Sequence, residues 1–288
     1  MLLLARVAVA TILAGQTVSA APTAGAAAKE EKAKPAAGST TAIDEFKADA
    51  KQYVMRLDAH PGRAFALAEE PLLHWGNPAR TGEDGAVFVW LLDGRPQVIG
   101  SIFTYRLQNT IYRKHEYHSL AAGPITAVYQ GRRVWAPRKA GVTFEPVPDD
   151  PAVPATPRAR LSQMKTVARW FSAKIEEAHG KKDELRLLPQ PLLHYESNDK
   201  KIDGALFSFS LGTDPEVILM LEADLDGRAW RYALARYHFV DLRVAYQGRE
   251  VWHAEPMPDD ISTLDIGTTK YQESVYATYH TVTTKIEE

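Results

Sequence analysis

Cysteine is absent from all 288 residues of the sequence. Its absence excludes disulfides, thiol catalysis, cysteine-ligated zinc sites and a lipid-modified N-terminal cysteine. An excess of one charge sign is also lacking, because 34 Lys and Arg residues against 36 Asp and Glu residues leave a formal net charge of −2. No field over the whole chain favours nucleic acid or an anionic membrane, so we expect no nucleic-acid partner.

The sequence also lacks the short motifs that carry well-known chemistry. It contains no Gly-rich phosphate loop, Gly-x-Ser-x-Gly elbow, His-Glu-x-x-His zinc motif, EF-hand loop or dinucleotide fingerprint. An active site can still be assembled from residues that lie far apart in the sequence. The sequence nevertheless predicts neither a cofactor nor a metal site.

The first 40 residues differ in composition from the rest. Residues 1–20 combine Arg6, a short apolar core and a Val-Ser-Ala ending, which is typical of a cleaved secretory signal peptide. The apolar core is too short to span a bilayer comfortably. Residues 21–40 are rich in Ala, Lys, Glu and Pro without a large apolar residue, which indicates a disordered tether. We therefore expect an exported protein, periplasmic or extracellular, without a membrane span after signal cleavage.

One long segment occurs twice in the remaining chain. Residues 71–135 return as residues 191–252, with offsets of 117–120 residues between matching positions. Pro-Leu-Leu-His, Asp-Gly-Ala, Tyr-His and Tyr-Gln-Gly-Arg recur in the same order, which predicts an internal duplication. The predicted organisation is repeat unit 1 at 41–150, a linker at 151–157, repeat unit 2 at 158–260, and a C-terminal extension with a strand at 261–288.

Each predicted unit opens with a helix and continues with strands. Apolar residues at helical spacing run from Ile43 to Leu57 and from Leu161 to Ile175. Segments with period-two alternation and Gly-containing turns then predict antiparallel strands. The predicted strands are 72–75, 86–92, 97–105, 111–120, 125–129 and 133–136 in unit 1, and 192–195, 205–211, 216–223, 229–240, 242–246 and 250–253 in unit 2.

The predicted fold class is α+β with an internal duplication, in which each unit is one N-terminal helix packed on an antiparallel β-meander. A helix alone cannot hide its apolar stripe and neither can a sheet, so each is expected to cover the other. The connections between strands are too short for parallel crossovers. A β-sandwich with two peripheral helices is the alternative.

Histidines and carboxylates, most of them at repeated positions, are the candidate binding residues. A histidine beside a carboxylate can work as an acid/base pair, whereas a metal site needs three or four converging ligands. Duplication copies structural residues as well, and an Asp before a strand can form a turn with its own backbone. No catalytic residue or metal ligand is therefore assigned. The binding candidates are His74, His118, Glu116, Asp84, His194, His238 and Asp203.

The residues that most resemble a chemical site belong to one copy. His115 and Glu116 are aligned with Ala235 and Arg236 of the second copy. The repeat therefore does not require them. We expect any function-specific site where the copies differ: in residues 105–116, at the Gly123-Pro124 turn, or in the C-terminal segment 271–285.

Three stretches of the second copy carry a resemblance. They are Asp-Gly-Ala-Leu-Phe at 203–207, Gly-Thr-Asp-Pro-Glu-Val-Ile at 212–218 and Gly-Arg-Glu-Val-Trp at 248–252, with weaker forms in the first copy. Together with the signal peptide, they make the chain resemble uncharacterised secreted proteins of planctomycete bacteria that have an internally duplicated domain of unknown function. The resemblance covers most of the chain after residue 42 and implies no activity, cofactor or functional residue.

These observations predict an exported, non-catalytic binding or structural module of two homologous units, whose partner is an extracytoplasmic ligand or protein. One alternative is an exported hydrolase or isomerase with a His-carboxylate pair in a pocket between helix and sheet. Another is a self-associating envelope or coat component. Two candidate residues within about 4 Å of each other in an open pocket would favour the enzyme, and isolated buried histidines would count against it.

Overall fold

The computed structural model describes residues 37–77, 83–149, 151–176 and 180–285. The predicted signal peptide, at 1–20, lies outside the described residues, as does the predicted tether except for residues 37–40. Those four residues open helix α1 (Ala37–Lys51), and helix α2 (Pro157–Ala168) follows later in the chain. In the described part of the chain, neither helix is long and apolar enough to cross a membrane.

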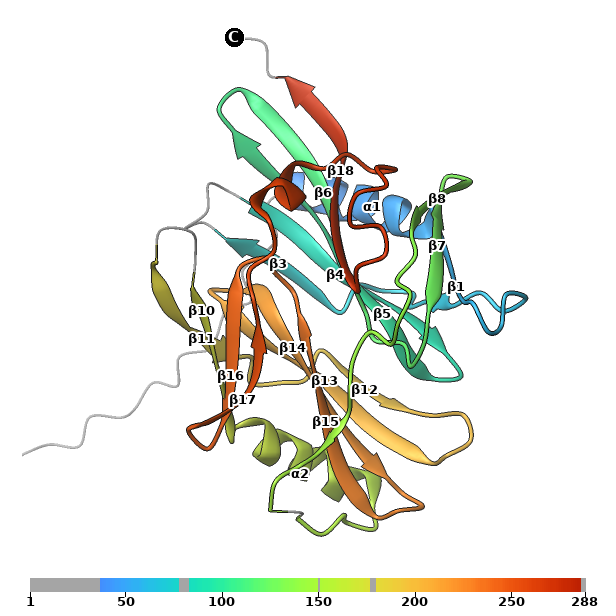
Figure 1. The fold of residues 1–288 in the computed structure, drawn as a ribbon, viewed down its shortest axis with the longest axis vertical. Helices are drawn as coiled ribbons and strands as arrows, with labels where there is room; N and C mark the ends of the chain where they lie inside the picture. The colour runs from blue at the N-terminus through green and yellow to red at the C-terminus, as the bar shows by residue number, and fades with distance from the viewer. Residues whose placement is uncertain (1–36, 78–82, 150, 177–179, 286–288) are drawn as a thin grey trace, which may run out of the picture. The chain divides into compact units, whose positions relative to one another are not determined.

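The first half of the described chain, residues 37–149, builds most of two sheets (Figure 1) and adds one short strand to a third. Strands β1, β7 and β8 form a three-stranded sheet, and a six-stranded sheet has the order β18–β6–β5–β4–β2 with β3 also paired to β4. The bounds are β1 (Tyr53–Leu57), β2 (Ala66–Leu67), β3 (Leu73–Asn77), β4 (Glu83–Leu92), β5 (Arg95–Leu107), β6 (Thr110–Ser119), β7 (Ile125–Tyr129), β8 (Arg132–Trp135) and β18 (Tyr276–Lys285).

The second half, residues 151–285, builds most of a nine-stranded sheet. Its order is β17–β16–β10–β11–β13–β14–β15–β9, with β12 paired to β13. The bounds are β9 (Glu145–Pro146), β10 (Phe171–Glu176), β11 (Lys182–Leu187), β12 (Leu193–Glu196), β13 (Ile202–Leu211), β14 (Asp214–Asp224), β15 (Ala229–Arg236), β16 (Asp241–Tyr246) and β17 (Arg249–Ala254). The named strands pair antiparallel throughout, which confirms the predicted antiparallel sheets.

The predicted α+β class with helix-plus-meander units was wrong. The protein is mostly β, with 52% strand against 12% helix and large antiparallel sheets. The sandwich alternative expects two facing sheets, whereas the described strands form two large sheets and a third, smaller one. Part of the error comes from residues 53–57 and 171–176, which were assigned to helices but form β1 and β10. Over segments this short, apolar residues that alternate along a strand also fit some of the spacings expected for a helix.

Matching segments of the two halves pair in the same way. In β3 and β4 His74 lies opposite Ala86, and in β12 and β13 His194 lies opposite Ala205. The pairing of β7 with β8 has the same register as the pairing of β16 with β17. Both pairs contain a bulge, between Ala127 and Val128 in the first and between Val244 and Ala245 in the second. The local pairing therefore repeats along with the sequence.

The two halves also exchange their final segments. Strand β9 ends the first half but pairs with β15 of the second half. Strand β18 ends the second half but pairs along β6 of the first half, as Figure 1 shows. The hairpin turns exchange contacts too, because Asn198 N donates to Asp93 O at 2.9 Å and Thr213 Oγ1 donates to Gly76 O at 2.6 Å. Neither half is complete by itself.

Three apolar clusters form the core. The first packs α1, through Phe46 and Ala50, against the six-stranded sheet, and the second packs α2 against the nine-stranded sheet. The third joins Val89 and Ile99 of the six-stranded sheet to Ile218 and other residues of the nine-stranded sheet. The two large sheets therefore face each other, and the residues between them come from both halves.

Candidate binding site

Two of the predicted histidines pair with the predicted aspartates. His74 Nε2 lies 2.6 Å from Asp84 Oδ1, and His194 Nε2 lies 2.7 Å from Asp203 Oδ1. The pairs are diagonal neighbours across hairpins, because each histidine faces the residue two places after its aspartate. Side chains at such diagonal positions can reach each other. The repeat therefore preserves an ion-pairing geometry.

The residues next to these pairs explain why the repeat keeps glycine there. A Cβ on Gly85 would lie 2.5 Å from the Trp75 ring, and one on Gly204 would lie 2.5 Å from the Tyr195 ring. Successive residues of a strand face opposite sides of the sheet. Each hairpin thus has a His–Asp pair on one side and an aromatic ring seated on glycine on the other.

Asp203 has a second partner on α2. Its Oδ2 accepts a hydrogen bond from Arg160 Nε of α2 at 2.5 Å, and both side chains are almost fully buried. Arg160 also donates to the carbonyls of Pro154 and Ala155. A buried guanidinium and carboxylate are tolerated when they pair and their remaining polar atoms are bonded. Asp203 therefore fastens α2 to the sheet, a role that leaves it little freedom for acid/base chemistry.

His118 and His238 do not occupy matching places, although the sequence alignment pairs them. Ile99 and Ile218 do match in the repeat, and they lie opposite His118 and Ala235 respectively. Ala235 therefore holds the place of His118, and His238 follows three residues later, beyond the end of β15. The alignment of these histidines was wrong because the strand register, which a short Tyr-His match cannot reveal, differs by three residues.

His238 and Glu116 both have structural contacts. His238 Nδ1 accepts a hydrogen bond from the Val240 amide at 3.3 Å, and its ring stacks on Phe239. Glu116 is buried on β6 and accepts a hydrogen bond from the Tyr276 hydroxyl of β18. This contact reflects the pairing of β6 with β18. That pairing brings together two of the segments, 105–116 and 271–285, in which a function-specific site was predicted.

His115, which the sequence singled out, lies in a buried cluster beneath α1 whose other members were not predicted. His115 on β6 is fully buried, with Nδ1 2.8 Å from the Tyr53 hydroxyl and Nε2 3.5 Å from Asp49 Oδ2 of α1. Burial lowers the pKa of His115, although Asp49 acts in the opposite direction. Thr281 of the C-terminal strand bonds Nε2 at 3.0 Å. The cluster ties α1, β1 and β18 to β6, and only the fold brings these four segments together.

A pocket of about 540 Å³ lies beside Trp252. Strands β15 and β17 both line it, although they lie near opposite ends of the nine-stranded sheet, so that sheet curves round on itself. The first half contributes His118, residues 139–143 and Glu145. We call this cavity the Trp252 pocket. Its lining residues are His118, residues 139–143, Glu145, Tyr232, Leu234, Arg236, residues 251–254 and Val275.

His118 supplies a fixed hydrogen-bond acceptor to the Trp252 pocket. Burial lowers its pKa to about 4, so the imidazole is neutral near pH 7. Nδ1 lies 2.7 Å from Ser119 O, and a carbonyl oxygen can only accept. Nδ1 therefore carries the proton and Nε2 is left as an acceptor. The side chain is only 3% exposed, so the fold holds this acceptor in one orientation.

The other charged groups of the Trp252 pocket do not favour one ligand charge. The guanidinium of Arg236 is held by three backbone carbonyls, those of His238, Val240 and Glu255, at 2.8–3.0 Å. Lys139 and Glu145 are exposed and have opposite charges. Tyr232 and Trp252 add aromatic rings. The pocket is therefore suited to a ligand that is polar and close to neutral.

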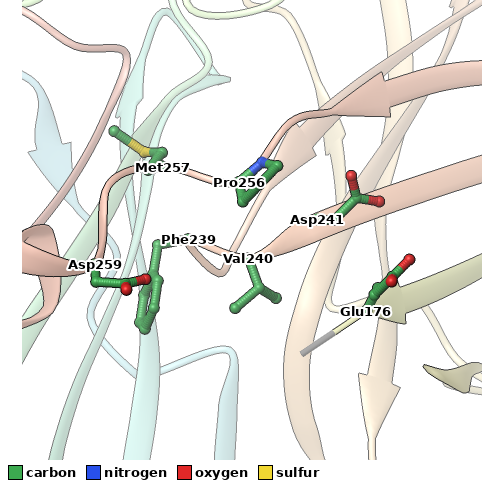
Figure 2. A pocket seen from close by; sticks show the side chains of 7 residues that line it. All are labelled: Glu176, Phe239, Val240, Asp241, Pro256, Met257 and Asp259. Carbon is green, nitrogen blue, oxygen red and sulfur yellow. The ribbon is translucent and has the colours of Figure 1, made fainter. Parts of the chain in front are cut away.

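Two smaller pockets have other characters. Figure 2 shows one of about 300 Å³ in which Phe239, Val240, Pro256 and Met257 form apolar walls beside three carboxylates. One of these carboxylates, that of Asp241, already bonds His253 at 2.6 Å. The other pocket, of about 490 Å³, lies where the Asp93 turn meets residues 197–199. None of these three pockets is lined by either of the repeated His–Asp pairs.

In the described residues, no group of three or more His, Asp or Glu side chains is placed to hold a metal ion. The candidate site residues thus separate into structural pairs, buried contacts and the single pocket acceptor of His118. Comparisons with family models, curated proteins and solved structures find no match to this chain. Its function therefore has to be inferred from the geometry described above.

Proposed function

We propose that the chain is an exported, non-catalytic binding module built from two homologous units, with its ligand site in the Trp252 pocket. The duplication is supported by the repeated strand register and by the exchanged segments β9 and β18. Export is supported by the signal-like composition of residues 1–20.

One observation carries the proposal: the Trp252 pocket is built from both halves. His118 and residues 139–143 come from the first half, and residues of β15 and β17 come from the second. A volume of about 540 Å³ falls in the range of small-ligand sites, and the lining combines aromatic surface with a few oriented polar groups. Such a pocket gives a physical reason to keep two units in one chain.

The acid/base alternative has weaker support. The two repeated His–Asp pairs that lie within hydrogen-bond distance do not line the Trp252 pocket, and Asp203 is occupied by Arg160. His118 does line it, but its pKa of about 4 makes it a poor general base near pH 7. These facts favour binding over hydrolysis or isomerisation.

A thermal-shift panel tests the binding proposal. The purified chain is heated with single amino acids, capped tripeptides, and oligosaccharides of glucose and of N-acetylglucosamine, in parallel with the Trp252→Ala variant. We expect one class to raise the Tm of the parent chain but not of the variant, because a ligand stabilises only the state that binds it. Mass spectrometry should recover that ligand unchanged.

Two outcomes of the panel contradict the proposal. Conversion of a bound compound into a product would favour the hydrolase or isomerase. Absence of any shift that depends on Trp252 would remove the Trp252 pocket as a ligand site. Export is tested separately by N-terminal sequencing of the protein released from secreting cells, which should begin at Ala21.

A further inference from the structure

Trp135 and Trp252 occupy matching places in the two halves. Each follows an Arg-x-Val segment and faces the strand residue directly before the bulge of its hairpin: Trp135 faces Ala127 and Trp252 faces Val244. Strands β8 and β17 are both terminal in the order of their sheets. A segment that binds at the outer edge of β8 therefore indicates what kind of segment could bind at the outer edge of β17.

In the first half this place is filled by a short segment of the chain itself. Trp135 is only 1% exposed, and its Nε1 donates to Ser274 O at 2.7 Å. The amide of Ala136 donates to Gln272 O at 2.7 Å, and Gln272 Nε2 donates to the carbonyl of Arg133. Residues 272–274 are thus bound at β8 as a peptide would be, mainly through backbone carbonyls.

Within the residues that the structure describes, no strand pairs with the outer edge of β17, where the matching place lies. The segment that crosses here, residues 139–145, is held against the first half, because the Gly141 amide donates to Ala121 O at 2.9 Å and a Cβ at Gly141 would lie 1.9 Å from Ser119 O. This segment reaches the nine-stranded sheet at Glu145, which pairs with Tyr232. Trp252 remains partly exposed beside a cavity of about 540 Å³. Among the described residues, none accepts a hydrogen bond from its Nε1.

The polar groups of the Trp252 pocket complement a peptide group. A peptide group has one N–H donor and one carbonyl acceptor. Trp252 Nε1 can donate to a carbonyl, as Trp135 Nε1 does, and the neutral Nε2 of His118 can accept from an N–H. An anion would meet the lone pair of His118, and Lys139 and Glu145 offset each other in charge.

We propose that the ligand of the Trp252 pocket is a short peptide segment of another protein, bound at the outer edge of β17 as residues 272–274 are bound at β8. This inference rests on the proposed function and names its ligand class. Recognition runs through the peptide backbone, with Trp252 Nε1 donating to one carbonyl and His118 Nε2 accepting one amide proton. Peptide binding at a sheet edge is a recurrent mode of recognition.

The test uses two peptide probes and the purified chain. The first is a fluorescent, acetylated and amidated peptide with the sequence of residues 270–276, Lys-Tyr-Gln-Glu-Ser-Val-Tyr. The second is a set of synthetic peptides selected from a phage-displayed random heptapeptide library, because the sequence of the partner is unknown. Affinity is measured by fluorescence anisotropy. We expect saturable binding of at least one probe.

Trp252→Phe keeps the aromatic ring and removes the Nε1 donor. Because one hydrogen bond is lost, we expect affinity to fall about five- to tenfold. Trp170→Phe is the matched control: it makes the same chemical change at a tryptophan that packs on Tyr246, outside the Trp252 pocket, and should leave affinity unchanged. Circular dichroism checks that both variants are folded.

The outcomes separate this inference from the proposed function. Equal affinity of a peptide for the parent chain and Trp252→Phe would overturn it, as would failure of both probes to bind. If both probes fail while an oligosaccharide of the thermal panel gives a shift that depends on Trp252, the peptide inference falls and the binding function stands. If nothing binds in either experiment, both fall.

Discussion

Asp84 and Asp203 have the same neighbours in sequence but different surroundings. Asp84 pairs with His74 where both side chains are about one-third exposed, at 33% and 36%. The Asp203 side chain is 2% exposed and lies between His194 and Arg160. The value of a charge pair depends on whether water can replace the lost partner. Matching residues of the two halves therefore need not contribute equally to the free energy of unfolding.

Replacing these two aspartates should have very different effects. We expect Asp203→Asn to lower the free energy of unfolding by about 3–5 kcal/mol, because it leaves the buried Arg160 guanidinium without its carboxylate. Asp84→Asn, the matched control, should cost about 0–1 kcal/mol. Urea denaturation measures both changes. Similar losses in the two variants would contradict the buried role assigned to Asp203.

His118 should make the protein less stable in mild acid. Its pKa is 6.5 in the unfolded chain and about 4 in the folded protein, where burial disfavours the charged form. Between these values the unfolded state binds the additional proton, so stability is full above pH 6.5 and falls as the pH drops toward 4. The loss from this group is on the order of 3 kcal/mol.

The His118→Asn variant tests this pH dependence. It keeps a donor near the position of Nδ1 but has no group that titrates in this range. Between pH 7 and pH 5, the urea midpoint should fall less in the variant than in the parent chain. His115 also has a lowered pKa and adds to the acid sensitivity of both proteins, so the comparison concerns the difference between them. An equal change of the urea midpoint between pH 7 and pH 5 in the two proteins would contradict the neutral, buried state of His118.

At the scale of elements, the repeated hairpins depend on glycine. Gly204→Ala would place a Cβ 2.5 Å from the Tyr195 ring, whose hydroxyl donates to Glu222 at 2.8 Å. Displacing the ring disturbs that bond, and we expect a loss of about 1–3 kcal/mol. Gly62→Ala is the control, because nothing lies within 4 Å of an added Cβ there. Calorimetry should give a lower Tm for Gly204→Ala alone.

Strand positions could be predicted from the sequence because alternation is a local signal. The predicted strand at residues 125–129 coincides with β7, and most others end within a few residues of the observed bounds. The helix ends could not be placed, since β1 begins two residues after α1 and its apolar residues continue the helical stripe. No periodicity distinguishes a strand that follows a helix from one more helical turn over so short a window.

The candidate site was only partly predictable. The repeated positions singled out His74, Asp84, His194 and Asp203 as candidates, but that each His pairs with the Asp of its own hairpin was not predicted. The Trp252 pocket could not be predicted, because His118, residues 139–143 and β17 meet only through the exchanged segments. Pairings between distant segments leave no periodic trace in the sequence. The difference between Trp135 and Trp252, one covered and one open, is likewise visible only in three dimensions.

At the scale of the whole molecule, a buried carboxylate joins the two halves. Glu222 is fully buried and accepts hydrogen bonds from Arg95 of the first half and Arg231 of the second at 2.7–3.1 Å. The Tyr195 hydroxyl gives it a further bond. Both guanidinium groups also lie over the Phe144 ring. The halves are thus joined by charge as well as by exchanged strands.

Glu222→Gln should weaken the whole fold rather than one half. Two guanidinium groups would lose their common carboxylate, and we expect a loss of about 3–5 kcal/mol. Glu184→Gln removes an exposed partner of Lys174 and should cost about 0–1 kcal/mol. Tryptophan fluorescence and circular dichroism, followed together in urea, should give a lower midpoint for Glu222→Gln only. A loss no larger than that of Glu184→Gln would contradict the role of Glu222.

The Trp252 pocket combines these scales: a fixed histidine, a strand edge left uncovered, and two halves that close around it. The most direct test is the ¹H–¹⁵N spectrum of the six tryptophan indoles, assigned with Trp252→Phe and Trp135→Phe, during titration with the selected peptides. We predict that the Trp252 indole N–H resonance shifts as its hydrogen bond forms, while that of Trp135, already bonded to Ser274 O, stays in place. A Trp252 resonance that does not move when peptide binds would contradict the account.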